Sequence, residues 1–165
     1  MSYEDHINNL LEQIRREREE EENIPKVEPP VFKTPSDLLS FLRNRPVTRS
    51  VEITTLSSFV RRFRRSLGVA PMALADALEI KLLDLQSLES NDCLPWTTSP
   101  RSSALVFAAY RIHVEAVKLL TENSHKIARV SARISDPSEA LELALTWLSQ
   151  VKSELERQNE SALLD

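Results

Sequence analysis

The apolar residues of this chain recur mainly at three- and four-residue steps, the spacing that places side chains on one face of a helix. The first such pattern covers residues 3–22 and predicts a helix with these apolar positions: Tyr3, Ile7, Leu10, Leu11 and Ile14. The second half of this helix is a run of charged residues. Because the apolar stripe is short, we expect the helix to need a surface to pack against.

Prolines separate this first helix from the rest of the chain. Four prolines lie within residues 25–35, which predicts an extended linker. A short helix follows, with Thr34 as its N-cap and Pro35 in its first position. This helix ends before Pro46 and places leucines and a phenylalanine against the core of the central part.

The next predicted helix carries an arginine-rich segment. Thr55 or Ser57 can cap it, and it runs to Leu67. Gly68 can end this helix because glycine adopts left-handed backbone angles without a steric penalty.

A helix, a tight turn and a second helix are predicted next, the first helix ending near Glu79 and the second beginning near Lys81. Their apolar positions can all face one core: Leu74, Ala75, Leu78, Ile80, Leu85 and Leu88.

This stretch resembles the helix-turn-helix of the Cro and lambda-repressor-like family, also called the xenobiotic-response-element family. The resemblance covers about residues 55–95 and rests on Arg64, Leu67-Gly68-Val69, Leu74-Ala75, Leu78, Ile80, Leu85 and Leu88-Glu89. It implies an all-α fold with a lambda-repressor-like core, and a partly buried ion pair between Arg64 and Glu89. It also implies a DNA-binding transcriptional regulator that needs no cofactor. One departure is Glu79, which stands where the family usually has a glycine in the turn.

For double-stranded DNA as the partner, the helix over residues 81–89 would enter the major groove. An arginine ridge would contact phosphates, although the same pattern also fits a solvated helix face. The residues expected to contact DNA are Arg61, Arg62, Arg65, Lys81, Leu82, Gln86 and Ser87.

A second interpretation follows from the poor fit of this helix to a base-reading role. Leu82 and Leu83 offer only apolar contacts, and the carboxylate of Asp84 repels phosphate. The helix-turn-helix fold would then be kept while Leu82 and Leu83 bind a protein, as in an antitoxin-like, anti-sigma-like or adaptor protein.

The C-terminal part is predicted to contain two further helices. Ser99 and Pro100 begin one long helix that extends to about Asn123. Asp136 begins another, with these apolar positions: Leu141, Ala144, Trp147, Leu148, Val151 and Leu155. This last stripe either packs against its own domain or pairs with a second copy. A protein partner or a homodimer would use residues 3–22 and 136–158.

Charged residues are distributed unevenly along the chain, and the change in sign falls near the boundary before the last predicted helix. The net charge is −4, but residues 49–133 hold 12 basic and 8 acidic residues. Residues 134–165 hold 2 basic and 7 acidic residues, which would keep this segment away from DNA. We therefore expect a charged helix at 1–24, a linker at 25–35, a helix-turn-helix domain at 36–133 and an acidic amphipathic helix at 134–165.

Enzymatic chemistry has little support in this sequence. His6, His113 and His125 are dispersed, and the chain has a single glycine, too few for a phosphate-binding loop. No spacing typical of metal ligands is present. The lone cysteine, Cys93, excludes an internal disulfide, and no signal peptide or membrane-spanning run is visible. We expect a cytoplasmic protein that is not an enzyme, has no cofactor or metal, and does not contact the membrane.

Overall fold

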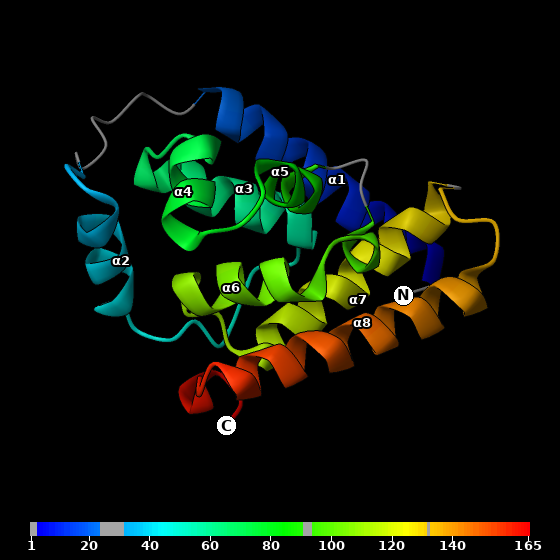
Figure 1. Cartoon of the computed structure of the whole chain (residues 1–165). Helices are drawn as coiled ribbons and strands as arrows, with labels where there is room; N and C mark the ends of the chain where they lie inside the picture. The colour runs from blue at the N-terminus through cyan, green and yellow to red at the C-terminus, as the bar shows by residue number, and fades with distance from the viewer. Residues whose placement is uncertain (1–2, 24–31, 91–93, 132) are drawn as a thin grey trace.

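The computed structural model describes residues 3–23, 32–90, 94–131 and 133–165. Within these residues the fold is all-α, as predicted, and the one β contact is an isolated bridge. Two 3₁₀ turns, at Pro95–Thr97 and Ser161–Leu163, accompany the α-helices (Figure 1). The helices are α1 (Tyr3–Asn23), α2 (Pro35–Arg43), α3 (Leu56–Leu67), α4 (Pro71–Leu78), α5 (Leu82–Glu89), α6 (Pro100–Tyr110), α7 (Val114–Val130) and α8 (Pro137–Arg157). Most of the predicted linker, together with Cys93, lies outside the described residues.

Side-chain caps set the predicted helix starts. The hydroxyl of Thr34 accepts a hydrogen bond from the amide of Asp37 at 3.2 Å, at the start of α2. Of the two candidates for α3, Thr55 is the N-cap, because its hydroxyl accepts from the amide of Ser58 at 3.1 Å. Asp136 caps α8 through one carboxylate oxygen, which accepts from the next two free amides. These local signals therefore fix where three of the helices begin.

The prediction of one long helix from Pro100 to about Asn123 was wrong. The chain leaves α6 through Arg111, whose φ of 55° is left-handed, and α7 begins at Val114. The backbone of Thr48 holds this break, accepting from His113 N at 2.9 Å and donating to the Arg111 carbonyl at 2.8 Å. His113 then caps α7 through Nδ1. A contact with a segment more than 60 residues away in the sequence thus interrupts a pattern that is locally helical.

Helix α6 lies in the middle of the molecule, with α8 along one side and α4 and α5 on the other (Figure 1). The core is continuous across these layers. Its largest fully buried side chains include Tyr110 and Phe107 of α6, Leu74 of α4, and Leu85 and Leu88 of α5. Helices α4 and α5 and the C-terminal helix α8 therefore share one core.

Helix α8 packs against its own chain. Ala140, Ala144, Trp147, Val151 and Leu155 are buried against α6 and α7. Trp147 donates its indole N–H to the carbonyl of Thr98 at 3.1 Å. Leu141, which the seam for a second copy would need, is exposed instead. Between the two alternatives for this helix, packing within the chain uses every predicted apolar position except Leu141, because Leu148 also packs against the core.

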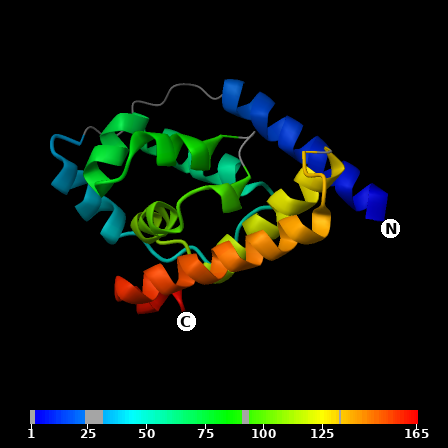
Figure 2. The ribbon, with the colours of Figure 1, turned by 45° about the vertical axis from the view of Figure 1, so that its right-hand side comes forward.

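Helix α1 also finds its packing surface within the chain. Ile7 and Leu10 are buried, and α1 packs against α7 (Figure 2). Near its C-terminal half, Glu17 is buried and accepts a hydrogen bond from the hydroxyl of Thr54 at 2.8 Å. A carboxylate on the predicted charged run therefore attaches the N-terminal helix to the central helices.

Candidate interaction face

Helices α4 and α5 form the predicted pair of short rods with a tight turn between them. Pro71 occupies the first turn of α4, where its missing N–H costs nothing. Glu79 ends α4 with φ 55° and ψ 40°, a left-handed conformation usually taken by glycine. The amide of Ile80 then bonds back to the carbonyl of Ala75 at 3.0 Å, which closes the helix end. The chain turns sharply here, and α5 begins one residue after Lys81.

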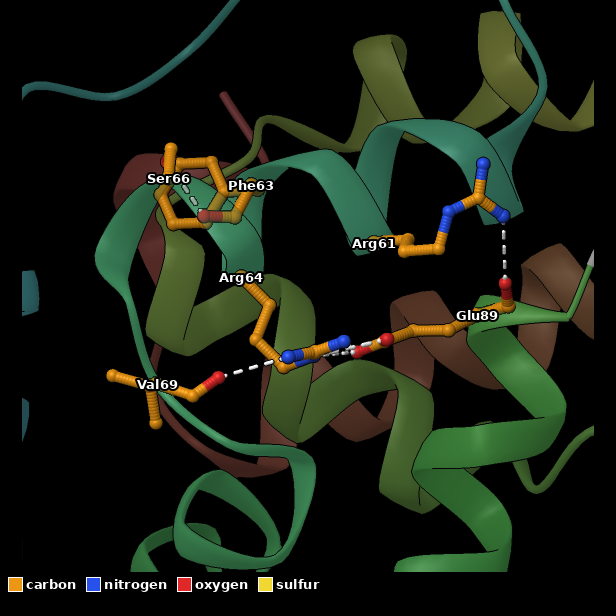
Figure 3. A network of polar contacts seen from close by, with 6 residues as sticks. All are labelled: Arg61, Phe63, Arg64, Ser66, Val69 and Glu89. Carbon is orange, nitrogen blue, oxygen red and sulfur yellow. Dashed lines mark hydrogen bonds and ion pairs between the residues drawn. The ribbon is translucent and has the colours of Figure 1, made fainter. Parts of the chain in front are cut away.

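An ion pair connects the end of α5 to α3. Arg64 Nε lies 2.9 and 2.8 Å from the two carboxylate oxygens of Glu89, and the two side chains are 12% and 8% exposed (Figure 3). Arg64 Nη1 also donates to the carbonyl of Val69 at 2.8 Å. One arginine therefore ties α3, the turn that follows it and the last residue of α5 together. This is the Arg64–Glu89 pair that the family resemblance implied.

The arginine ridge expected on α3 is not a uniform exposed surface. Arg61 is half-buried and donates from Nη1 to the backbone carbonyl of Glu89 at 3.3 Å (Figure 3). Arg62 lies 3.5 Å from the buried carboxylate of Glu17. Arg65, near the end of α3, is exposed. The guanidinium groups of Arg61 and Arg62 thus make contacts inside the molecule.

The predicted base-reading residues of α5 separate into outward and inward groups. Lys81 and Gln86 are exposed, Ser87 is half-buried, and Leu82 packs against the edge of the core. Leu83, by contrast, is 70% exposed. The most outward apolar side chain of this helix is therefore Leu83, with Leu82 partly withdrawn beneath the surface.

Asp84 does not project as a free carboxylate. Its Oδ2 accepts a hydrogen bond from the hydroxyl of Ser102 in α6 at 2.8 Å, and the residue is half-buried. The repulsion of phosphate expected from Asp84 is therefore reduced, because the side chain is directed toward α6. The exposed carboxylates of this region come from α4 and its C-cap, at Asp76 and Glu79.

Sequence reasoning missed Met72, which is 61% exposed on the first turn of α4. Leu83 and Met72 are the two most exposed large apolar side chains among the described residues. The outward surface of the two helices is called the α4–α5 face below. Its exposed residues are Met72, Ala73, Asp76, Glu79, Lys81, Leu83 and Gln86. The sequence did contain a sign of this exposure, because Met72 is not one of the apolar positions of α4 and α5 that were expected to face the core.

An aromatic stack joins α3 to α6. Phe63 stacks on Tyr110 with ring centroids 4.2 Å apart, and the guanidinium carbon of Arg45 lies 4.2 Å from the Phe63 centroid. Burial and, to a smaller degree, the negative charge of Glu89 raise the pKa of Tyr110, while Arg64 opposes the shift. Burial lowers the pKa of Arg45. These groups support the α3 helix from the inside.

The histidine and acidic side chains of the described residues do not gather into a metal site. The described ranges contain no cluster of three or more histidine, cysteine or acidic side chains able to hold a metal ion. His113 caps α7, and His125 Nε2 lies 3.0 Å from the Pro137 carbonyl at the start of α8. The two described histidines of the central part therefore have structural contacts.

Comparison of the chain with protein-family models, with curated proteins and with solved structures gave no match. The described helices include none that combines the length and the apolar character needed to cross a lipid bilayer.

Proposed function

We propose that this chain is a protein-interaction module that keeps a helix-turn-helix core and binds a protein partner through the α4–α5 face. The observation that carries the proposal is the placement of Leu83 and Met72. The two most exposed large apolar side chains of the described residues both project from this helix pair. In a DNA reader, polar side chains that bond to base edges occupy such positions.

The energetics of the face favour a protein surface as its partner. Fully burying a leucine or methionine side chain contributes about 1.5–3 kcal/mol, so Leu83 and Met72 supply a driving force only when an apolar surface covers them. Asp76, Glu79, Lys81 and Gln86 surround them with polar groups. An apolar centre with a polar rim is the usual composition of a protein–protein interface.

Binding of double-stranded DNA is the second candidate, and exposed Lys81 and Gln86 on α5 favour it. The net charge of residues 49–133 is also positive. Against it, the exposed charged residues of the face are Asp76, Glu79 and Lys81, an excess of one negative charge. Arg61 and Arg62 make contacts inside the molecule. Phosphate contacts supply most of the affinity in DNA binding, so this charge balance favours a protein partner.

Site-specific photocrosslinking distinguishes the two candidates. A photoreactive amino acid replaces Leu83 or Met72 in the full chain, which is expressed and irradiated in cells. The matched control replaces Leu143 on α8, which is 51% exposed and lies outside the face. We expect one discrete, nuclease-resistant protein adduct from positions 83 and 72 and none from position 143. Nuclease-sensitive adducts, or the same adducts from all three positions, would contradict the proposal.

A further inference from the structure

A pocket of about 470 Å³ adjoins the α4–α5 face. It lies between the beginning of α2, the turn from α3 to α4, and the outer side of α4. Phe32, Leu38, Val69, Ala70, Ala73 and Asp76 are among the residues that line it. Helices α2 and α4 pack beside each other at this end of the molecule (Figure 1). The pocket is therefore framed by three separate segments that the fold holds together.

The lining of this pocket is suited to an apolar group. Its walls are mainly apolar side chains and the backbone of Gly68, with Lys33 and Asp76 as the charged residues. Pockets that hold small molecules or anchoring side chains have volumes of about 300–1,000 Å³, so one bulky side chain fits. The hydroxyl of Thr34 is already used to cap α2. Few polar groups would lose a partner when an apolar side chain enters.

The pocket and the α4–α5 face are continuous. Ala73 and Asp76 belong to both, and Met72 and Asp76 lie one helical turn apart on the exposed side of α4. Glu79 is the C-cap residue of α4, three positions after Asp76, and both residues are exposed. Neither carboxylate forms an ion pair with another residue of the described ranges. A partner that contacts Met72 would therefore also contact the pocket and the carboxylates of Asp76 and Glu79.

Resting on the proposed function, we infer that the pocket anchors one bulky apolar side chain of the protein partner, and that Asp76 and Glu79 select a basic residue beside it. The partner is thus a protein segment in which an aromatic or large aliphatic residue is followed by lysine or arginine. Burial of the anchor supplies most of the affinity, as anchor residues in pockets do at protein interfaces. The carboxylates contribute specificity more than affinity.

Two short peptides and an NMR titration test this inference. The full chain, labelled with ¹⁵N, is titrated with N-acetyl-Trp-Lys-Arg-amide and with N-acetyl-Trp-Glu-Glu-amide. We expect both peptides to shift the amides of Gly68, Val69 and Ala73, which line the pocket or its rim. The basic peptide should bind about fivefold more tightly, because two exposed ion pairs contribute about 0.5 kcal/mol each.

Variants separate the two parts of the inference. Ala73→Trp fills the pocket from an exposed helix position and should abolish the shifts, whereas Ser149→Trp on the exposed side of α8 should leave them unchanged. The double variant Asp76→Asn, Glu79→Gln should remove the preference for the basic peptide and keep the binding. Equal affinity of the two peptides for the unmodified chain would overturn the selection of a basic residue.

Other occupants of the pocket give distinct results. Pocket amides that shift on dilution of the chain alone would assign the pocket to a second copy and overturn the inference. Absence of shifts at the pocket with either peptide would overturn it as well. If the crosslinks at positions 83 and 72 persist in that case, the proposed function stands and only the anchor pocket is wrong. If the crosslinks are also absent, both proposals fail.

Discussion

The Nε atom of Arg64 donates to both carboxylate oxygens of Glu89, at 2.9 and 2.8 Å, from a side chain that is 12% exposed. This contact joins α3 to the last residue of α5, and the same guanidinium reaches the Val69 carbonyl in the turn before α4. It therefore fixes the angle between the two helices that carry Met72 and Leu83. The stability of this arrangement is expected to depend on both partners, because removing one leaves a desolvated charge behind.

The first prediction concerns this ion pair. Arg64→Ala should lower the free energy of unfolding by about 3 kcal/mol, since Glu89 would keep a buried, uncompensated carboxylate. Arg61→Ala should cost less, because Arg61 is half-buried and its 3.3 Å hydrogen bond goes to the backbone carbonyl of Glu89, so no buried carboxylate loses its counter-ion. Urea unfolding followed by circular dichroism measures both variants. Equal midpoints for the two would mean that the pair does not hold α5 in place.

A second prediction concerns the left-handed residue between α4 and α5. Glu79→Gly should raise the free energy of unfolding by about 1 kcal/mol, because glycine adopts the observed φ of 55° without the steric cost of a Cβ. Glu79→Ala removes the same charge but keeps the Cβ, so it is the control. Thermal unfolding of the three proteins gives the comparison. If Glu79→Ala stabilises the fold as much as Glu79→Gly, the gain comes from charge and not from the backbone.

The buried phenol of Tyr110 yields a pH-dependent prediction. Its hydroxyl has no hydrogen-bond partner among the described residues, so Tyr110→Phe should keep or increase stability at pH 7. Burial raises the pKa of Tyr110, so the folded state favours the neutral phenol. The stability that this preference provides is complete below the pKa of tyrosine in the unfolded chain, about 10, and it declines as the pH rises above that value.

Unfolding by urea at several pH values above 10 tests this decline. The wild type should lose up to about 1.4 kcal/mol more per pH unit than Tyr110→Phe, because only its unfolded state releases the phenolic proton. Other groups titrate equally in both proteins, so the difference isolates Tyr110. Parallel stability curves for the two proteins would show that the phenol ionises in the folded state.

A fourth prediction addresses the role of α8. Trp147, Val151 and Leu155 belong to the same core as Phe107 of α6, so a chain ending at residue 134 should lose cooperative unfolding. Trp147→Phe should cost about 1–3 kcal/mol, since the buried carbonyl of Thr98 would lose its donor. Leu143→Ala, on the exposed side of the same helix, should cost less than about 0.5 kcal/mol. A cooperative melt of the shortened chain would instead show that α8 is a separate unit.

Sequence reasoning located the elements whose signals are local. Thr34 and Asp136 marked helix starts, Gly68 marked an end, and the apolar steps between Leu74 and Leu88 placed the turn. Each of these depends on side chains within a few residues of the backbone groups that they satisfy. The Arg64–Glu89 pair became predictable only through the family resemblance, because nothing in the spacing joins two residues 25 positions apart.

Contacts between distant segments were beyond the reach of the sequence pattern. The break at Arg111 depends on Thr48, and the attachment of Arg62 depends on Glu17, 45 residues earlier. Exposure of Met72 likewise depends on where α4 lies relative to the core. These features decide how much of the arginine ridge and of the α4–α5 face is available to a partner, and they become visible only in the fold.

The most direct test of the α4–α5 face is a titration of fluorescently labelled duplex DNA with the full chain at low salt, followed by anisotropy. If the face binds protein, we expect no saturable binding of DNA at micromolar concentrations of the chain. DNA-binding proteins bind even nonspecific sites with dissociation constants down to about 10⁻⁶ M at physiological salt, so this concentration range would reveal a DNA reader. Leu83→Asp, which changes the face but not the core, should leave this result unchanged. Saturable binding that weakens as salt is added, and that is lost in Lys81→Ala, would contradict the account and identify the face as a DNA reader.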